Sequence, residues 1–461
     1  MSINFTRKAY LEVWRDNTYI SRHTSLIEAG ESASRHADDY GSGDYYITIG
    51  GPPESFTQIM ADGLPHNVQA GKVYYMARAD VTIRFSESAP VNAYPIGAQA
   101  SAASSAVSAL SGANDIVANI TGTGITGSPG AVFASVPAVG GIFSELVGYG
   151  ANTTGGKNGT VVTVTNLNDT GPGSLRDALD NRPGGPIWIV FTEGLTGTMS
   201  IGARLNVDSN TTIDGRGADI TIDGGGTDQL YISSGDTNII LMYLKISNAD
   251  NDNVGCDGDV GNNNYWMHHL TCGPAVDGTI DYTSGVTDIT MSYCWHDNRV
   301  SGEQKGTLIG GSNGFPNDEM FTTFHHNYWN TAQRQPRTRT CRLHAYNNYH
   351  RGWNTNAAAM IGDSGQCYFE NNIGDAGFSS GSTVVDWRAG DPVPGKVKSV
   401  GTHLLLNGAS VTERDPSGVF NPYADYSVTP ETADTTLRQK IFDEAGWQLV
   451  AHPGYTAPWD N

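Results

Sequence analysis

Short apolar stretches recur along the chain from about residue 139, and polar, glycine-rich turns separate them. Several stretches end at an equivalent position, which gives a column of six residues at intervals of 21 to 33 residues: Leu244, Leu270, Cys294, Asn327, Asn348 and Asn372. Repeats of this length are typical of a solenoid. The units have strand-forming composition with no helix between them, so the pattern predicts an all-β fold, a right-handed parallel β-helix.

Two helices and one insertion interrupt the regular repeat. Ser174 is a suitable N-cap for a short amphipathic helix over residues 171–180, which we expect to cap the open end of the solenoid. Residues 435–446 predict a second helix. The longest interval of the column, from Cys294 to Asn327, contains an insertion around residues 299–320, and insertions in solenoids tend to shape the binding face. The asparagines in the column favour an internal ladder of stacked amides.

The residues that precede the solenoid have a different pattern of apolar and polar positions. Residues 1–92 alternate apolar and polar positions between turn signals, which predicts a small β-rich accessory or attachment module. Residues 93–138 are rich in Ala, Ser and Gly and are interpreted as a linker. Alternatively, residues 100–113 form a helix that packs against copies of itself, which would make the protein a homotrimer. Residues 139–461 then form the β-helix domain with its C-terminal helix.

Composition narrows the function classes. The formal net charge is −20, from 27 basic and 47 acidic residues, so no basic surplus exists to neutralise nucleic-acid phosphates. No apolar run reaches transmembrane length. The 57 glycines fit an architecture of many short strands and turns. The five cysteines cannot all pair within the chain, so they are interpreted as buried small apolar residues, with one disulfide as the alternative.

Four acids of the solenoid predict a calcium site. Asp257 and Asp259 are separated by one residue, Asp277 and Asp281 by three, and the second pair follows the first at close to the length of one coil. In extended segments each pair shares a face, so the two pairs would stack roughly 5 Å apart. Carboxylates that close repel one another unless a hard cation lies between them, and an all-oxygen site suits Ca²⁺. The alternative is that they are solvated turn residues.

Cations follow on the next coils. Lys305 lies one repeat further along the chain than Asp281, and the only basic cluster of this acidic chain comes next, with Arg334, Arg337 and Arg339. The cluster is interpreted as a clamp for sugar carboxylates in which one arginine acts on the substrate. A surface face of salt bridges is the alternative. The three arginines cannot all point the same way in an extended segment.

With these residues in place, the stretch 141–375 resembles the pectate lyase family of parallel β-helix polysaccharide lyases. The similar segments include TTIDGRG (211–217), QKGTLIGG (304–311) and AQRQPRTR (332–339), and they occur in the family's order over about half of the chain. The resemblance implies that Asp257, Asp259, Asp277 and Asp281 bind Ca²⁺, that Lys305 and Arg339 bind substrate and assist catalysis, and that Arg334 is the base. As part of the basic cluster, Arg337 is also expected to bind substrate. One departure is His268, where the family usually has Asp.

The implied reaction is β-elimination on a uronate polymer similar to pectate. A base removes the C5 proton, and a cation stabilises the charge that develops on the adjacent carboxylate. A guanidinium is a poor base in water, so it needs cationic neighbours and desolvation to serve.

Competing interpretations stay open at this stage. The run G-G-S-N-G at residues 310–314 matches an esterase motif, but without the strand–turn–helix context. Several histidines could suggest zinc, but their spacing does not favour it. A glycoside hydrolase would need two carboxylates flanking the cleaved bond. The non-enzymatic alternative is a carbohydrate-binding or adhesive β-helix of a virion tailspike that has lost catalytic activity. Its target would be a capsular polysaccharide or exopolysaccharide.

The expected location is outside the cell. Residues 1–16 lack a secretory apolar core, which fits either a virion tail, where trimers are common, or a secreted enzyme whose leader is not part of this sequence.

Overall fold

The structure is a computed structural model, and it describes strands within residues 1–127 together with residues 141–258, 263–299, 303–311, 320–377, 379 and 381–460. The chain divides into two compact units, Met1–Phe133 and Ala134–Asn461. Among the described residues no helix is both long and apolar enough to cross a membrane. The stretch 100–113, on which the trimer prediction depends, lies outside the described residues.

The first unit contains small antiparallel sheets, as the alternating pattern of residues 1–92 predicts. A two-stranded pair, β10–β11, lies within the segment interpreted as a linker. The strands are β1 (Ser2–Asn4), β2 (Tyr10–Arg15), β3 (Thr18–Arg22), β4 (Ser32–Ser34), β5 (Tyr45–Gly50), β6 (Gln58–Ala61), β7 (Leu64–Asn67), β8 (Tyr74–Tyr75), β9 (Val81–Arg84), β10 (Ala118–Thr121) and β11 (Gly124–Gly127).

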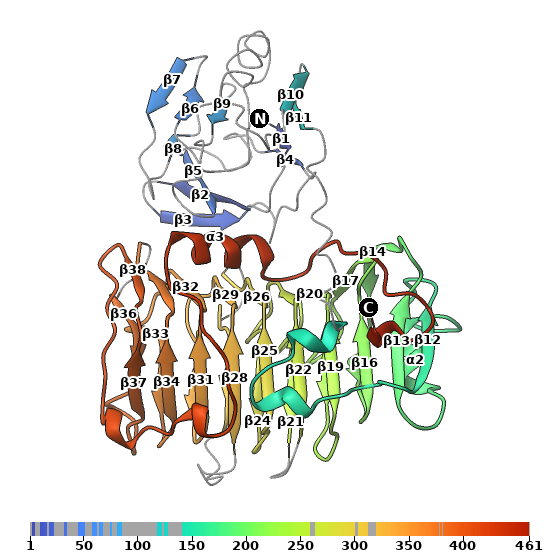
Figure 1. Cartoon of the computed structure of the whole chain (residues 1–461). Helices are drawn as coiled ribbons and strands as arrows, with labels where there is room; N and C mark the ends of the chain where they lie inside the picture. The colour runs from blue at the N-terminus through green and yellow to red at the C-terminus, as the bar shows by residue number, and fades with distance from the viewer. Residues whose placement is uncertain are drawn as a thin grey trace. The chain divides into compact units, whose positions relative to one another are not determined.

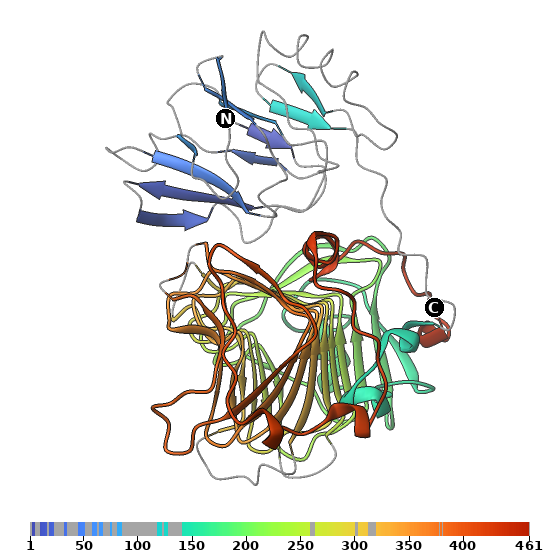
Figure 2. The same cartoon turned by 60° about the vertical axis from the view of Figure 1, so that its left-hand side comes forward.

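The second unit is a parallel β-helix, which confirms the predicted fold class. Three parallel sheets of ten, nine and eight strands run along it, and each complete coil contributes one strand to each sheet in turn (Figures 1 and 2). The ten-stranded sheet comprises β12 (Thr160–Val164), β13 (Ile187–Phe191), β16 (Thr211–Asp214), β19 (Ile239–Met242), β22 (Tyr265–His268), β25 (Ile289–Ser292), β28 (Phe321–His325), β31 (Arg342–Tyr346), β34 (Gln366–Glu370) and β37 (Lys396–Val400).

The other two sheets have shorter strands. The nine-stranded sheet comprises β14 (Thr196–Ser200), β17 (Asp219–Asp223), β20 (Lys245–Ser247), β23 (Thr271–Cys272), β26 (Trp295–His296), β29 (Tyr328–Trp329), β32 (Tyr349–Arg351), β35 (Ile373–Asp375) and β38 (Leu404–Leu406). The eight-stranded sheet comprises β15 (Leu205–Asn206), β18 (Leu230–Ile232), β21 (Val254–Asp257), β24 (Ile280–Thr283), β27 (Leu308–Ile309), β30 (Arg337–Arg339), β33 (Ala357–Gly362) and β36 (Thr383–Asp386).

The predicted asparagine ladder lies inside the turn between the ten- and nine-stranded sheets. Asn327 donates from Nδ2 to Asn348 Oδ1 at 2.9 Å, and Asn348 donates to Asn372 Oδ1 at 3.1 Å. Asn327 Oδ1 accepts the backbone N–H of Cys294 at 2.9 Å. All four side chains are buried, so the ladder satisfies amide groups that burial would otherwise leave unpaired. All five cysteines are free and buried, as their interpretation as small apolar residues predicts.

Both predicted helices form. Helix α2 (Leu175–Asp180) begins after Ser174, whose hydroxyl accepts the N–H of Asp177, and its apolar side chains join the core of the solenoid. Helix α3 (Thr435–Glu444) begins after Asp434, whose carboxylate accepts two backbone N–H groups. Phe442 of α3 contacts aromatic rings on β26 and β29, so this helix covers the nine-stranded sheet. The 3₁₀ helices are η4 (Ile142–Glu145), η5 (Tyr149–Asn152), η6 (Pro416–Gly418), η7 (Pro422–Ala424) and η8 (Pro458–Asp460).

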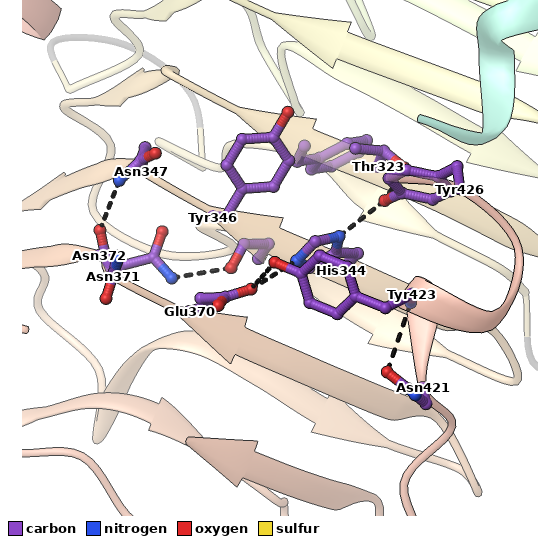
Figure 3. Close-up of polar contacts among 12 residues, drawn as sticks. Thr323, His344, Tyr346, Asn347, Glu370, Asn371, Asn372, Asn421, Tyr423 and Tyr426 are labelled. Atoms are coloured by element: carbon purple, nitrogen blue, oxygen red, sulfur yellow. Dashed lines mark hydrogen bonds and ion pairs between the residues drawn. The ribbon is translucent and has the colours of Figure 1, made fainter. Parts of the chain in front are cut away.

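The segment around η7 lies on the outer face of the ten-stranded sheet, fixed by a hydrogen-bond chain (Figure 3). The Tyr426 hydroxyl lies 2.8 Å from Thr323 Oγ1 and 2.6 Å from His344 Nδ1. On the other side of the ring, His344 Nε2 lies 3.2 Å from Glu370 Oε2, which also accepts the Tyr423 hydroxyl at 2.7 Å. Burial lowers the pKa of His344, so the neutral imidazole accepts from Tyr426 and donates to Glu370.

Candidate active site

Residues that lead into the eight-stranded sheet stack on one another through backbone hydrogen bonds. Asn251 N–H donates to the Thr227 carbonyl at 2.7 Å, and Asp277 N–H donates to the Asn251 carbonyl at 2.9 Å. Lys305 N–H donates to the Asp277 carbonyl at 3.3 Å. Asp277 and Lys305 therefore lie on successive coils, at the same point of each coil.

On each coil, the residue that directly follows this first column belongs to a second column, and its residues change from acidic to basic along the solenoid. Asp252 follows Asp228, and its N–H donates to the Asp228 carboxylate at 3.3 Å. Glycines occupy the next two coils, at Gly278 and Gly306, and Arg334 follows. A Cβ on Gly306 would collide with the Arg334 carbonyl, so the close approach of these coils requires glycine.

Glycine at position 278 lets two carboxylates lie close to its backbone. A Cβ there would lie 2.7 Å from Asp252 Oδ1 and 3.2 Å from Asp281 Oδ1. Asp252 Oδ1 also accepts the Gly278 N–H at 2.7 Å, and Asp281 Oδ1 accepts the Leu308 N–H at 2.8 Å. Carboxylate oxygens from two successive coils thus lie close to the same glycine, and this donor set fits a hard divalent cation.

The electrostatics of these acids agree with that fit. Burial raises the pKa of Asp252, and the charges of Asp281, Asp277 and Asp228 raise it further. Burial also raises the pKa of Asp281, although Arg334 and the Leu308 N–H oppose the shift. Both carboxylates are destabilised as anions by lost hydration and by one another, so positive charge bound between them would relieve the cluster.

Two cationic side chains border the acids. Lys305 Nζ lies 2.6 Å from Asp277 Oδ1 and also contacts Glu303. Arg334 Nη1 lies 3.7 Å from Asp281 Oδ2, with 18% of its side chain exposed. The Arg334 backbone is left-handed (φ 57°), which L residues rarely adopt. Its guanidinium therefore reaches both the acid cluster and solvent.

The other two predicted arginines have different surroundings. The Arg337 side chain is 8% exposed, with Nη2 2.5 Å from Asp391 and 3.5 Å from Asp363. Arg339 is 29% exposed, and its Nε lies 3.2 Å from the same Asp363 carboxylate. Asp363 therefore forms ion pairs with both arginines, and Arg337 is the more deeply buried of the two.

Asp257 lies in a different environment from the other acids. Its carboxylate accepts the hydroxyls of Thr283 at 2.7 Å, Ser284 at 2.8 Å and Tyr231 at 3.0 Å. Burial alone would raise the Asp257 pKa, but these hydrogen bonds lower it. Asp259 lies outside the described residues.

The structure brings Asp252 and Asp228 into the cluster, and the sequence interpretation missed both. It stacked Asp257 and Asp259 on the later acids by assuming a coil that is too short, whereas the strand pairing places Gly255 beside Asp281. That register places Asp257 two positions further along the strand than the partner of Asp281. The sequence feature that could have identified these acids is the nearly equal spacing of Asp228, Asp252 and Asp277. This spacing matches the interval between Leu244, Leu270 and Cys294 in the column described above.

Fold and site together define a parallel β-helix with carboxylates and cations converging on one sheet. The family model described as "Pectate lyase" matches residues 202–449, more than half of the chain. The chain belongs to the pectate lyase family.

Plant proteins are among its relatives. "Probable pectate lyase 18" of Solanum lycopersicum is 30% identical over 257 residues, which are 49% of this chain and 61% of the relative. "Pectate lyase" of Nicotiana tabacum is 31% identical over 233 residues, 45% of this chain and 56% of the relative. The chain thus spans about three fifths of the length of these relatives.

Solved structures show the same fold. The crystal structure of jun a 1, the major allergen from cedar pollen, is similar with a TM-score of 0.55 and 25% identity, covering 66% of this chain and 92% of that one. An arginine-to-lysine mutant of Bacillus subtilis pectate lyase has a TM-score of 0.50 and 20% identity, covering 66% and 97%. The second comparison supports the fold alone.

Proposed function

We propose that this protein is a polysaccharide lyase that cleaves a pectate-like uronate polymer by β-elimination and requires Ca²⁺. The observation that carries the proposal is the convergence of three carboxylates and two cations on consecutive coils: Asp252, Asp277, Asp281, Lys305 and Arg334. A polyanionic substrate needs this combination, because a strongly acidic protein otherwise repels it.

Asp252, Asp277 and Asp281 are the residues we assign to the cation, with Asp228 adding negative charge beside Asp252. Asp277 and Asp281 belong to the ligand set expected from the sequence, and Asp252 takes the place expected for Asp257. When bound there, Ca²⁺ supplies Lewis acidity toward a substrate carboxylate.

Arg334 is the residue we assign as the base. In its neutral form it would accept the C5 proton of the uronate, the C5–H electrons would form the C4–C5 double bond, and the bond from C4 to the glycosidic oxygen would break. The leaving oxygen takes a proton and becomes a hydroxyl on the other fragment. The partly exposed guanidinium suits this role, since it can touch a bound sugar while Asp281 limits its orientation.

Lys305 and Arg339 are assigned to binding of substrate carboxylates. Arg339 is suited to this role because its side chain is 29% exposed and its guanidinium can make charge-assisted hydrogen bonds with a sugar carboxylate. The sequence also placed Arg337 in this set, but its buried pairing with Asp391 makes it a support for the neighbouring arginine in this proposal.

The decisive test is activity on polygalacturonate, followed by the absorbance of the unsaturated product. Chelation should abolish turnover, and Ca²⁺ should restore it better than Mg²⁺, since a flexible carboxylate site suits the larger ion. Full activity in excess chelator would refute the metal requirement. New reducing ends without unsaturated product would indicate hydrolysis, and tight polymer binding without cleavage would indicate the adhesive alternative.

We also propose that the enzyme acts outside the cell that makes it, because its polymeric substrate does not cross membranes. Its partner is then the acidic polysaccharide itself.

A further inference from the structure

A second group of metal-binding side chains lies on the ten-stranded sheet, away from the eight-stranded sheet of the candidate active site. Glu145 of η4, His268 at the end of β22 and His269 in the following turn each place one potential ligand atom within 4.8 Å of the others. The two histidines are buried and Glu145 is partly exposed, so an ion could enter from the Glu145 side. Two imidazoles and one carboxylate are a ligand set of known zinc sites.

In each histidine, the Nδ1 atom already has a hydrogen-bond partner, and this contact fixes the orientation of the ring. His269 Nδ1 lies 3.0 Å from the carbonyl oxygen of Gly446, and since a carbonyl only accepts, Nδ1 carries the proton. His268 Nδ1 lies 2.9 Å from the hydroxyl of Ser292, which also accepts the indole N–H of Trp266. Histidines that bind metals typically have their other nitrogen in such a hydrogen bond.

The remaining nitrogen of His268 points to the third ligand. His268 Nε2 is fully buried and makes no hydrogen bond of good geometry, although Glu145 Oε2 lies 3.2 Å away. Bonds of about 2.1 Å to a tetrahedral zinc ion place two ligand atoms about 3.4 Å apart. The observed separation is therefore close to that of two ligands of one ion. The separations of up to 4.8 Å within the group require side-chain shifts of only about 1 Å.

Charges around the group favour a cation. Arg216 lies close enough to act on Glu145, but its guanidinium is paired with the buried Asp214 at 2.7 Å. Glu444 adds a second carboxylate charge that acts on Glu145. Lys440 also acts on Glu444, so the three carboxylates of Glu145, Glu444 and Asp214 outnumber the two cations by one.

We propose that Glu145, His268 and His269 bind a zinc ion that fastens both terminal segments of the β-helix unit to its ten-stranded sheet. Glu145 brings η4, which precedes the solenoid, and His269 holds the segment after α3 through Gly446. The role is structural, and it does not depend on the proposed lyase activity.

The test uses the full chain, stripped with a chelator and returned to buffer with excess Ca²⁺ to saturate hard oxygen sites. Titration with ZnCl₂, measured by calorimetry and by metal content, should show one bound equivalent. The melting temperature should rise with zinc concentration, because zinc binds the folded state. CoCl₂ in place of zinc should give the intense visible absorption of a tetrahedral site with nitrogen ligands.

Variants locate the ion. Glu145→Gln should weaken zinc binding at least about tenfold and remove the melting shift. His269→Gln should do the same while keeping a donor for the Gly446 carbonyl. The matched control is Glu431→Gln. Glu431 Oε1 lies 2.9 Å from His326 Nε2, so this variant also removes a carboxylate that pairs with a buried histidine. Lys440 Nζ lies 2.6 Å from the same oxygen, where a metal site would have a cation. This control should bind zinc normally. A wild-type protein without zinc binding, or Glu145→Gln and His269→Gln proteins with unchanged affinity, would overturn the proposal.

Discussion

Asp252 and Asp257 are the same residue type on one coil, but their surroundings shift their pKa values in opposite directions. Burial and neighbouring carboxylates raise the pKa of Asp252. Asp257 is partly buried as well, but three hydroxyl donors lower its pKa. A carboxylate already solvated by protein donors gains less from a cation than one surrounded by like charges. The local donors therefore distinguish the acid that we propose as a metal ligand from one at the end of a strand, which the sequence alone does not.

The first prediction follows from this contrast. Asp252→Asn should weaken Ca²⁺ binding at least about tenfold, since it removes a ligand oxygen charge, whereas Asp257→Asn should change it little. Calorimetric titration with Ca²⁺ measures both, and the Ca²⁺ concentration for half-maximal activity gives a second readout. The opposite ranking would return the metal site to the set expected from the sequence.

The second prediction concerns Arg334. Arg334→Lys should lose nearly all kcat while keeping polymer binding, because lysine keeps the charge but not the planar fork that places nitrogen against C5. Steady-state kinetics should then show a fall in kcat with KM nearly unchanged. Arg204→Lys is the control, since Arg204 is exposed and stacks over Tyr231.

The outcome for this arginine can also contradict the assignment. A Lys variant with unchanged kcat and a raised KM would make Arg334 a substrate clamp. Arg337→Lys is unsuitable as a control, because the Arg337 side chain is buried against Asp391 and its replacement should lower stability.

The third prediction links a buried histidine to pH. Burial lowers the pKa of His296 from about 6.5 to about 3, and its ring stacks on Trp329 with centroids 3.8 Å apart. Between these values the unfolded chain binds a proton that the folded chain does not. Stability is therefore complete above about pH 6.5 and falls as the pH drops below it, by up to about 1.4 kcal/mol per unit from this group.

Urea unfolding at pH 7 and pH 5 tests this. His296→Gln should be less stable at pH 7, but its loss of stability between the two pH values should be about 2 kcal/mol smaller than that of the wild type. Equal losses would mean that other groups cause the pH dependence.

At the level of elements, the sequence predicted those features that depend on local chemistry or on repetition. Ser174 and the spacing of Leu175, Ala178 and Leu179 gave helix α2. The asparagine column gave the ladder, because buried amides in consecutive coils can satisfy only one another and the backbone. Both inferences need the approximate coil length only.

The acid cluster needed the register itself, and there the sequence interpretation fell short. The strand pairing places Gly255 beside Asp281, whereas the shorter coil assumed from the spacing of the acids favoured Asp257. Turns of unequal length separate the strands of each coil, so spacing in the chain does not give the register without the pairing. The dependence of the cluster on Gly278 was also invisible, since it arises from close approach between coils.

The fourth prediction tests the ladder. Asn348→Ala should lower the unfolding free energy by about 3 kcal/mol, because it removes the side-chain hydrogen bonds of Asn348 with Asn327, Asn372 and the Phe324 carbonyl and leaves the buried Asn327 backbone N–H without its acceptor. Cys294→Ala, a truncation in the same column without loss of a side-chain amide, should cost clearly less. Denaturant unfolding measures both, and a similar cost for the two variants would show that volume matters here more than hydrogen bonding.

At the scale of the whole molecule, the second unit contains everything that its fold and proposed chemistry use. Its apolar core is continuous from Val164 to Val397, and a second cluster packs Ile142 and Trp447 over the ten-stranded sheet. Every residue assigned to the metal, the base or the substrate lies between positions 228 and 339. Terminal segments on both sides of the solenoid contribute to its outer faces, so the unit needs residues from about 141 to its end.

The last prediction is therefore that a fragment starting at Ala134 folds and cleaves with the kcat of the full chain. The boundary follows the division between the compact units. Polygalacturonate kinetics and thermal unfolding compare the fragment with the whole protein, and light scattering tests whether residues 100–113 cause trimerisation, since only the full chain would then be a trimer. A fragment starting at Thr160 is the control. It lacks η4 and η5, and with them the Glu145 contact to His268 and the Gly150 contact to Thr290, so it should melt at a lower temperature. If the fragment from Ala134 folds but loses most of its kcat, the first unit contributes to the active site, and the assignment of the chemistry to one sheet of the β-helix is incomplete.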